Sequence, residues 1–77
     1  MEINDFIENF ANQFDETEPS SFDSSTKFRT DIDEWDSLIA MSVIAMVDDE
    51  YNVIIKGDDI RDCDTVEDLF NLVKSRV

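Results

Sequence analysis

Only one short segment of this chain contains residues suited to a chemical role. The chain has no histidine, so a serine here cannot act with a histidine base as in a Ser-His-Asp triad. Carboxylates could in principle pair as general acid and base, but no pocket to hold them can be predicted in 77 residues. What remains is Asp36, Ser37 and Leu38, directly before a run of apolar residues. If a helix begins there, its free N–H groups and its dipole favour a phosphate on Ser37. The plainer interpretation is a helix N-cap, in which Asp36 or Ser37 satisfies those N–H groups.

A calcium loop of the EF-hand type does not fit the spacing of the acids. Such a loop needs oxygen ligands at its first, third and fifth positions, glycine at the sixth and glutamate at the twelfth. A loop starting at Asp31 places Asp33 third, but Trp35 fifth, Asp36 sixth and Ser42 twelfth. We therefore predict no dedicated metal site, although so many acids can bind divalent ions weakly at the surface.

The charge of the chain is strongly negative. Twenty acidic and six basic residues give a net charge of −14, and every charged residue from Glu2 to Asp23 is acidic. Such a field repels nucleic acids and anionic membranes and attracts basic protein surfaces. We expect neither nucleic acid nor membrane as a partner. A simple solubility coat is the alternative explanation of the charge.

Cysteine content and hydropathy indicate the compartment. The single cysteine, Cys63, excludes an internal disulfide, and its thiol is expected in the core or half-buried. The N-terminus has no basic segment followed by an apolar run, and no apolar stretch approaches the ~18 residues of a membrane span. We expect a monomeric cytoplasmic protein.

The first helix and the connection after it should position the Asp36–Leu38 segment. Apolar residues at helical spacing predict a helix from Ile3 to Phe14, with Asn4 or Asp5 near its start. Residues 15–35, with Pro19 as a helix breaker, then form a long connection that needs apolar anchors to stay ordered. The residues expected to anchor it against the helices are Phe22, Phe28 and Ile32.

The second predicted helix runs from Asp36 and Ser37 to about Tyr51 and is apolar almost all round. Between Leu38 and Val47 its only polar residue is Ser42. The face expected to meet the core consists of Ala40, Val43, Ile44, Val47 and Tyr51, flanked by Ile39 and Met46. The opposite face consists of Leu38, Met41, Ser42, Ala45, Asp48 and Asp49. A small domain cannot cover a helix on every side, so the second apolar face favours docking of a partner.

The remaining third of the chain completes an all-α fold. Residues 51–55 have strand propensity but no partner strand, so we expect an extended connection ending at Gly57. One short helical turn is expected over residues 58–62, with Ile60 inward. A last helix follows from Asp64 or Thr65, either of which can cap it. Its expected inner stripe is Val66, Leu69, Phe70, Val73 and Val77.

Together these elements predict a small helical bundle of three main helices plus one short helix, with a long first connection. The length predicts a single domain over residues 1–77. Ile, Val, Phe and Leu make up 23 of the 77 residues, well above the roughly 20 % that indicates disorder.

The segment from Trp35 to Leu38, near the middle of a strongly acidic chain of this length, resembles the phosphopantetheine attachment motif of acyl carrier proteins. The similarity covers almost the whole chain. It includes the Phe-rich first helix, residues 24–29 before the motif, the acidic end of the second helix at residues 48–51, and residues 64–69 at the start of the last helix.

The resemblance implies a carrier that performs no catalysis itself. A phosphopantetheinyl transferase would move 4'-phosphopantetheine from coenzyme A onto Ser37, between Asp36 and Leu38, leaving a phosphodiester. The thiol at the tip of the arm would then hold acyl groups as thioesters. Partner enzymes that load, elongate or transfer the acyl group would dock through basic patches. The positions that match the docking helix of the family are Leu38, Met41, Ala45, Asp48, Asp49 and Glu50.

Two departures leave the pathway open. Fatty-acid carriers usually have acids in the first two turns after the serine, where this chain has Ile39 and Ser42. They also commonly have glycine shortly before the motif, where this chain has residues 33–35, Asp-Glu-Trp. Tryptophan there is more similar to carriers of polyketide, peptide or specialised pathways. Fatty-acid, polyketide or related biosynthesis therefore stands beside a peptidyl or aminoacyl carrier, and beside a cofactor-free acidic adaptor, against which the intact motif argues.

Overall fold

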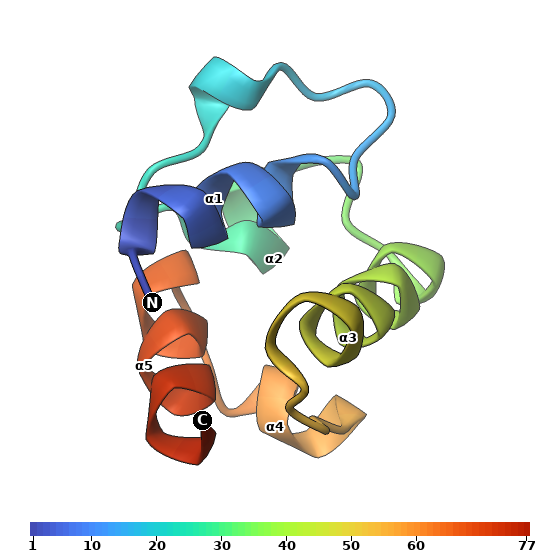
Figure 1. Cartoon of the computed structure of the whole chain (residues 1–77). Helices are drawn as coiled ribbons and strands as arrows, with labels where there is room; N and C mark the ends of the chain where they lie inside the picture. Colours follow the sequence, from blue (N-terminus) through green and yellow to red (C-terminus); the bar gives the residue numbers. More distant parts are fainter.

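A computed structural model describes all residues, 1–77, and contains helices joined by irregular segments (Figure 1). In chain order the elements are α1 (Ile3–Ala11), the 3-10 turn η1 (Pro19–Ser21), α2 (Phe28–Asp31), α3 (Ser37–Tyr51), α4 (Gly57–Arg61) and α5 (Val66–Arg76). The predicted all-α bundle is confirmed, with three main helices, a short α4 and a long first connection. That connection also contains η1 and the four-residue helix α2, which the sequence did not predict. None of the helices is long and apolar enough to cross a membrane.

The first helix is shorter than predicted. It ends at Ala11 rather than at Phe14, because the chain tightens into bonds from Gln13 N–H to the Phe10 carbonyl and from Phe14 N–H to the Ala11 carbonyl, each 3.1 Å long. This tighter turn brings the Phe14 ring into the core, where it is buried. Its start also differs from the prediction, because Glu2 occupies the cap position and makes no side-chain capping bond.

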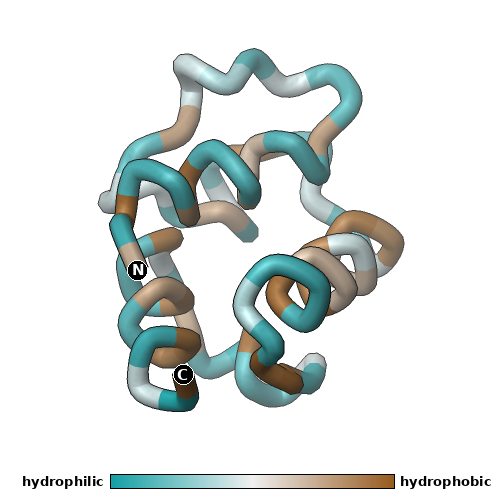
Figure 2. The backbone as a smooth tube through the Cα atoms, viewed as in Figure 1, coloured by the Kyte–Doolittle hydropathy of each residue, from teal (hydrophilic) through white to brown (hydrophobic).

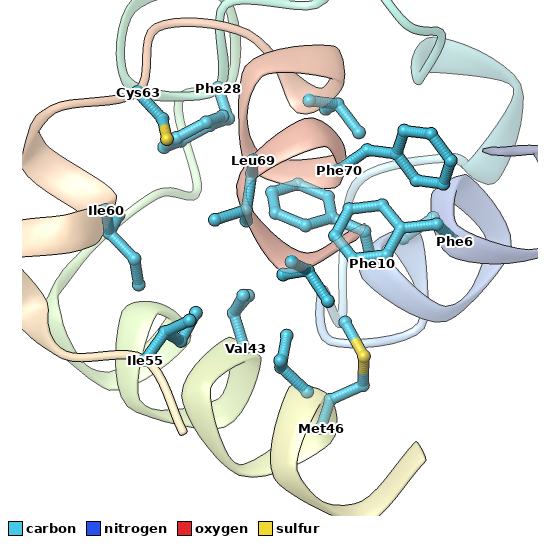
Figure 3. Close-up of a cluster of buried hydrophobic side chains, with 14 of the residues drawn as sticks. Phe6, Phe10, Phe28, Val43, Met46, Ile55, Ile60, Cys63, Leu69 and Phe70 are labelled. Atoms are coloured by element: carbon cyan, nitrogen blue, oxygen red, sulfur yellow. The ribbon is translucent and has the colours of Figure 1, made fainter. Parts of the chain in front are cut away.

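Aromatic side chains fill the side of the core between α1 and the first connection. Phe10 is completely buried, and five aromatic rings lie around it with centroids 5.5–6.5 Å away. They belong to Phe6, Phe14, Phe22, Phe28 and Trp35. The predicted anchors Phe22, Phe28 and Ile32 are all buried, so this part of the prediction is confirmed. The other side of the core, toward α3, α4 and α5, is mainly aliphatic (Figure 3).

The third helix turns a slightly different face to the core than predicted. Its buried residues are Ile39, Val43, Met46 and Val47, whereas Ala40, Ile44 and Tyr51 are only half-buried. Tyr51 stays at the edge because its hydroxyl accepts a hydrogen bond of 2.9 Å from the Asn9 side chain of α1. Ala40 and Ile44 face an open groove beside α4 instead of the centre of the core.

The segment after α3 is extended, as predicted. Asn52 ends α3 in the left-handed conformation, with φ of 55°, and its N–H donates to the Asp48 carbonyl at 3.0 Å. Val53 and Ile55 are buried, while Ile54 between them is exposed. Their alternation gives strand-like backbone without a partner strand, and the only β-bridge in the chain joins Lys27 to Thr65.

The last helix is capped by Thr65, which decides between the two predicted caps. The Thr65 hydroxyl accepts from the Asp68 N–H at 3.1 Å, and the Asp68 carboxylate accepts from the N–H groups of Thr65 and Asp64, both at 3.0 Å. The predicted inner stripe is buried from Val66 to Val73, but the prediction for Val77 is wrong. Val77 lies beyond the end of the helix and is exposed.

Candidate functional site

The N-terminus of α3 places Ser37 at the surface. Asp36 is extended, with φ of −154°, and its Oδ1 accepts a hydrogen bond of 2.9 Å from the Ile39 N–H. Its carbonyl accepts the first intrahelical bond, from the Ala40 N–H at 3.0 Å. Asp36 is therefore the N-cap, and Ser37 is the first residue of the helix.

The helix cap and the candidate attachment site are thus two different residues. Because Asp36 does the capping, the Ser37 hydroxyl makes no hydrogen bond and is exposed. The N–H groups of Ser37 and Leu38 lie in the first turn, where a helix offers no carbonyl acceptor. A free hydroxyl thus stands beside two free N–H groups at the positive end of a 15-residue helix. These residues fit a phosphate group attached at Ser37.

The backbone just before the site is held by Glu34. Its Oε2 accepts from the Asp15 N–H at 2.7 Å, and its Oε1 accepts from the N–H groups of Glu16 and Thr17 and from the Thr17 hydroxyl, at 2.8–3.0 Å. One carboxylate therefore ties residues 15–17, in the connection that follows α1, to a residue three positions before Ser37 in sequence. Desolvation raises the pKa of Glu34, but the Thr17 hydroxyl and the three N–H groups outweigh it and hold that pKa below its usual value.

Trp35 anchors the same segment by packing. Its ring lies 4.7 Å from the ring of Phe28 and 6.4 Å from that of Phe10, measured between centroids. Aromatic pairs at these distances stabilise by about 0.5–1.5 kcal/mol each beyond their buried area. Glu34 and Trp35 together fix the direction in which the chain enters α3.

A groove of about 470 Å³ opens beside Ser37, between α3 and α4. These two helices lie next to each other, and α4 lies between α3 and α5 (Figure 1). The apolar part of the groove is formed by Trp35, Ala40, Met41, Ile44 and Ile60, and Asp36 and Ser37 stand at its border. Two of the six basic residues of the chain, Arg29 and Arg61, complete the lining together with Gly57.

The two arginines of the groove differ in what they bind. The Arg29 guanidinium donates to the carbonyls of Ile60 at 2.7 Å, Arg61 at 3.2 Å and Cys63, so it holds the end of α4. Arg61 pairs only with Asp58 on the same helix, and both side chains are mostly exposed, at 73 % and 81 %. Arg29 is therefore structural, whereas Arg61 has donors left for another group.

The outer face of α3 carries the side chains predicted for docking. Leu38 is 72 % exposed and Met41 65 %, and Ala45 is exposed as well. Figure 2 shows hydrophobic residues on the outer side of the first turns of α3. The acidic residues at the other end of this helix, Asp48, Asp49 and Glu50, are also exposed.

Sequence reasoning missed the groove and the role of Glu34. Nothing in the sequence links Glu34 to residues 15–17, because the contact joins positions 17–19 residues apart in a connection without periodicity. The single glycine of the chain, Gly57, lies at the groove, but in the sequence it indicates only the end of a connection.

Comparison with known proteins gives one family. The model of a family described as the phosphopantetheine attachment site matches residues 5–73 of the 77. No individual curated protein and no solved structure shows a significant match to the chain.

Proposed function

The chain belongs to the phosphopantetheine-attachment family, and on that premise we propose that Ser37 carries the 4'-phosphopantetheine arm. Members of this family hold the group covalently, and a carrier role follows from membership. The observation that best supports Ser37 is the division of roles at the start of α3. Asp36 satisfies the helix, and the neighbouring hydroxyl is left exposed and unbonded.

Attachment is a single substitution at phosphorus. The Ser37 Oγ forms a bond to the phosphorus of coenzyme A that bears the pantetheine, and the bond from that phosphorus to adenosine 3',5'-bisphosphate breaks. The hydroxyl proton passes to a base of the transferase, since this chain has no histidine and Asp36 is engaged with the Ile39 N–H. The new phosphodiester carries one negative charge, which the N–H groups of Ser37 and Leu38 stabilise.

We extend the proposal to the whole chain. Residues 1–77 form one non-catalytic, monomeric carrier domain of the cytoplasm, and its arm holds acyl intermediates as thioesters. The partners are a phosphopantetheinyl transferase and the enzymes of fatty-acid, polyketide or related biosynthesis that act on those thioesters. A tryptophan at position 35 favours the polyketide and specialised carriers, including peptidyl carriers, over the fatty-acid carriers.

The experiment that tests Ser37 is a mass measurement. The apo protein, coenzyme A and a broad-specificity transferase should give one added arm, and Ser37→Ala should give none while keeping its helical circular dichroism. Ser42→Ala, on the exposed face of the same helix, is the matched control and should be modified as wild type is. Modification of Ser37→Ala, or no modification of wild type, would contradict the proposal.

We also propose that the outer face of α3 docks partner enzymes. Acids in the last turn of a helix oppose its dipole, and the last turn of α3 contains three of them and no basic residue. Asp48, Asp49 and Glu50 form no ion pair that would offset this cost. A basic surface on a partner enzyme would supply ion pairs to these acids. Leu38, Met41 and Ala45 would give apolar contact near the arm.

The two ends of this surface should act on different rate constants. Long-range charge sets mainly the association rate and is screened by salt, so Asp48→Lys with Asp49→Lys should slow association and flatten its salt dependence. Contact at Met41 acts after docking, so Met41→Ala should speed dissociation, costing about 1 kcal/mol or more if the residue is an anchor. Surface plasmon resonance with the cognate enzyme measures both. Unchanged dissociation together with a loss of stability as large as that of a core truncation would show that Met41 only packs.

A further inference from the structure

The only glycine in the chain, Gly57, lines the groove beside Ser37. Gly57 is the first residue of α4 and has no positive φ, so its backbone does not require glycine. A Cβ built at Gly57 would meet no atom within 4 Å, so close packing does not require glycine either. A glycine at a helical position costs stability relative to alanine. The remaining consequence of a missing side chain here is free space in the groove.

The groove also has an unusual charge for this molecule. The chain carries −14, yet two of its six basic residues line this one depression, together with a single acid, Asp36. Arg29 is occupied by three carbonyl groups, so Arg61 is the available cation. Its pairing with Asp58 is solvent-exposed, and exposed pairs of this kind are weak enough to exchange for another carboxylate.

We propose that this groove selects cargo with an apolar body and an anionic end, Gly57 leaving the space and Arg61 binding the anion. The inference rests on the proposed attachment of the arm at Ser37. The apolar walls of Ala40, Ile44 and Ile60 cover the carbon chain of the acyl group, and the Arg61 guanidinium pairs with a carboxylate at its far end. The occupant is thus the acyl part of a dicarboxylic acid, joined to the arm through one of its carboxyl groups.

A matched pair of cargoes tests this selection. The transferase would load glutaryl or 5-methylhexanoyl phosphopantetheine from the corresponding coenzyme A esters; the two differ mainly in a carboxylate against an isopropyl group of similar shape. The rate of thioester cleavage by hydroxylamine measures how far the groove protects each cargo. Wild type should protect glutaryl about two- to fivefold better than Arg61→Gln does, the range expected from an exposed ion pair. The 5-methylhexanoyl thioester should be cleaved equally in both proteins.

Further variants separate charge from space. Lys74→Gln removes the same charge from α5, away from the groove, and should leave the protection of glutaryl unchanged. Asp58→Asn removes the competing carboxylate and should increase that protection. Gly57→Phe should expose both thioesters, whereas Gly57→Ala should keep most of their protection. Thermal melting establishes that Gly57→Phe is folded. The comparison of wild type with Arg61→Gln does not depend on the Gly57→Phe variant.

The phosphodiester on Ser37 is a second anion to which Arg61 could bind. If Arg61 binds that group, the ³¹P resonance of the holo protein without cargo should shift in Arg61→Gln, and the inference is overturned. It is also overturned if Arg61→Gln affects both cargoes equally or neither. In the expected case, the ¹³C-labelled carboxylate of loaded glutaryl titrates at a lower pH in wild type than in Arg61→Gln. Failure to load any cargo onto wild type refutes the attachment itself, and the mass spectrum distinguishes that result from the others.

Discussion

Two irregular regions flank α3, and they are built in opposite ways. The connection before it, residues 12–36, is long, yet it is anchored by buried aromatic rings, by Glu34 and by two bonds that its carbonyls accept from the first turn of α5. Those two bonds join Thr26 to the Val66 N–H at 3.1 Å and Ser24 to the Glu67 N–H at 2.9 Å. The region after α3, residues 52–61, is short but contains an exposed Ile54 and a glycine in open space, and it forms one wall of the groove.

The difference shows that the length of a connection does not determine its order. The long region fixes the entry of the chain into the helix that begins at Ser37, while the short region leaves free volume next to it. A carrier needs both properties, because its attachment point must be presented in one direction while the cargo changes during a pathway. Substitutions on either side of α3 can test this contrast.

The largest effect is expected at the centre of the aromatic cluster. Phe10→Ala removes the ring that five other rings contact, and such truncations cost about 3–5 kcal/mol. Because small domains have only about 5–15 kcal/mol in total, the variant should be close to unfolding at room temperature. Ile44→Ala, at the half-buried wall of the groove, should cost clearly less. Urea denaturation of both variants compares the aromatic cluster that anchors the long connection with the wall of the groove, and equal losses would remove the contrast.

A smaller effect is expected from Glu34→Gln. The amide keeps the shape of the side chain, but it loses the charge and one of the two acceptor oxygens that receive four hydrogen bonds. The melting temperature at pH 7 should fall, and amide exchange at residues 15–17 should become faster. Glu16→Gln, whose carboxylate makes none of these contacts, is the control and should change neither.

The loss of stability in Glu34→Gln should depend on pH in a defined direction. The pKa of Glu34 is lower in the folded state than its ordinary value of 4.5, so the folded state binds this proton less tightly than the unfolded chain does. Its contribution is therefore complete above that value and disappears as the pH falls through the folded pKa. Wild type and Glu34→Gln should differ at pH 7, and the difference should shrink progressively as the pH falls below 4.5. A constant difference down to pH 3 would show that the carboxylate charge is not responsible.

The same direction applies to Asp23, Asp59 and Asp68. Hydrogen bonds lower the pKa of each below the ordinary 3.8: from Ser25 to Asp23, from Arg76 to Asp59 and from the Thr65 N–H to Asp68. Mutual repulsion within a chain of −14 acts the other way, because partial protonation relieves it. We expect divalent cations, or a change from pH 7 toward about pH 5, to raise the melting temperature, and a sharp fall below pH 4. A steady fall from pH 7 to pH 5.5 would contradict the role of repulsion.

The smallest effect is expected at Gly57. Alanine there meets no atom and keeps a helical backbone, so Gly57→Ala should raise the free energy of unfolding by up to about 0.5–1 kcal/mol. A gain in stability for Gly57→Ala, beside a loss for Phe10→Ala, would confirm that a side chain at position 57 meets free space whereas the ring of Phe10 fills its site. Destabilisation by Gly57→Ala would mean that the space in the groove is needed for folding.

The sequence predicts the start of α3 well and its surroundings poorly. Asp36 is a strong cap directly before an apolar run, so local chemistry is enough to place the helix start at Ser37. The end of α1 is missed because the burial of Phe14 outweighs its helical spacing, and the facing of α3 because Tyr51 bonds to Asn9 in a distant helix. The groove depends on α3 and α4 lying side by side with the Arg29 guanidinium against them. The periodicity of a single sequence contains no information on which distant elements contact each other.

Arg29 has a consequence for the order in which the molecule forms and opens. A helix of five residues has almost no stability of its own, and the carbonyls at the end of α4 receive their donors from Arg29, which lies 31 and 32 positions earlier in the chain. The helix can therefore persist only after residues distant in sequence have come together. We expect α4 to form late in folding and to be among the first parts to open transiently in the native state. The groove would then be the most short-lived part of the site, renewed many times while α3 and its serine stay in place.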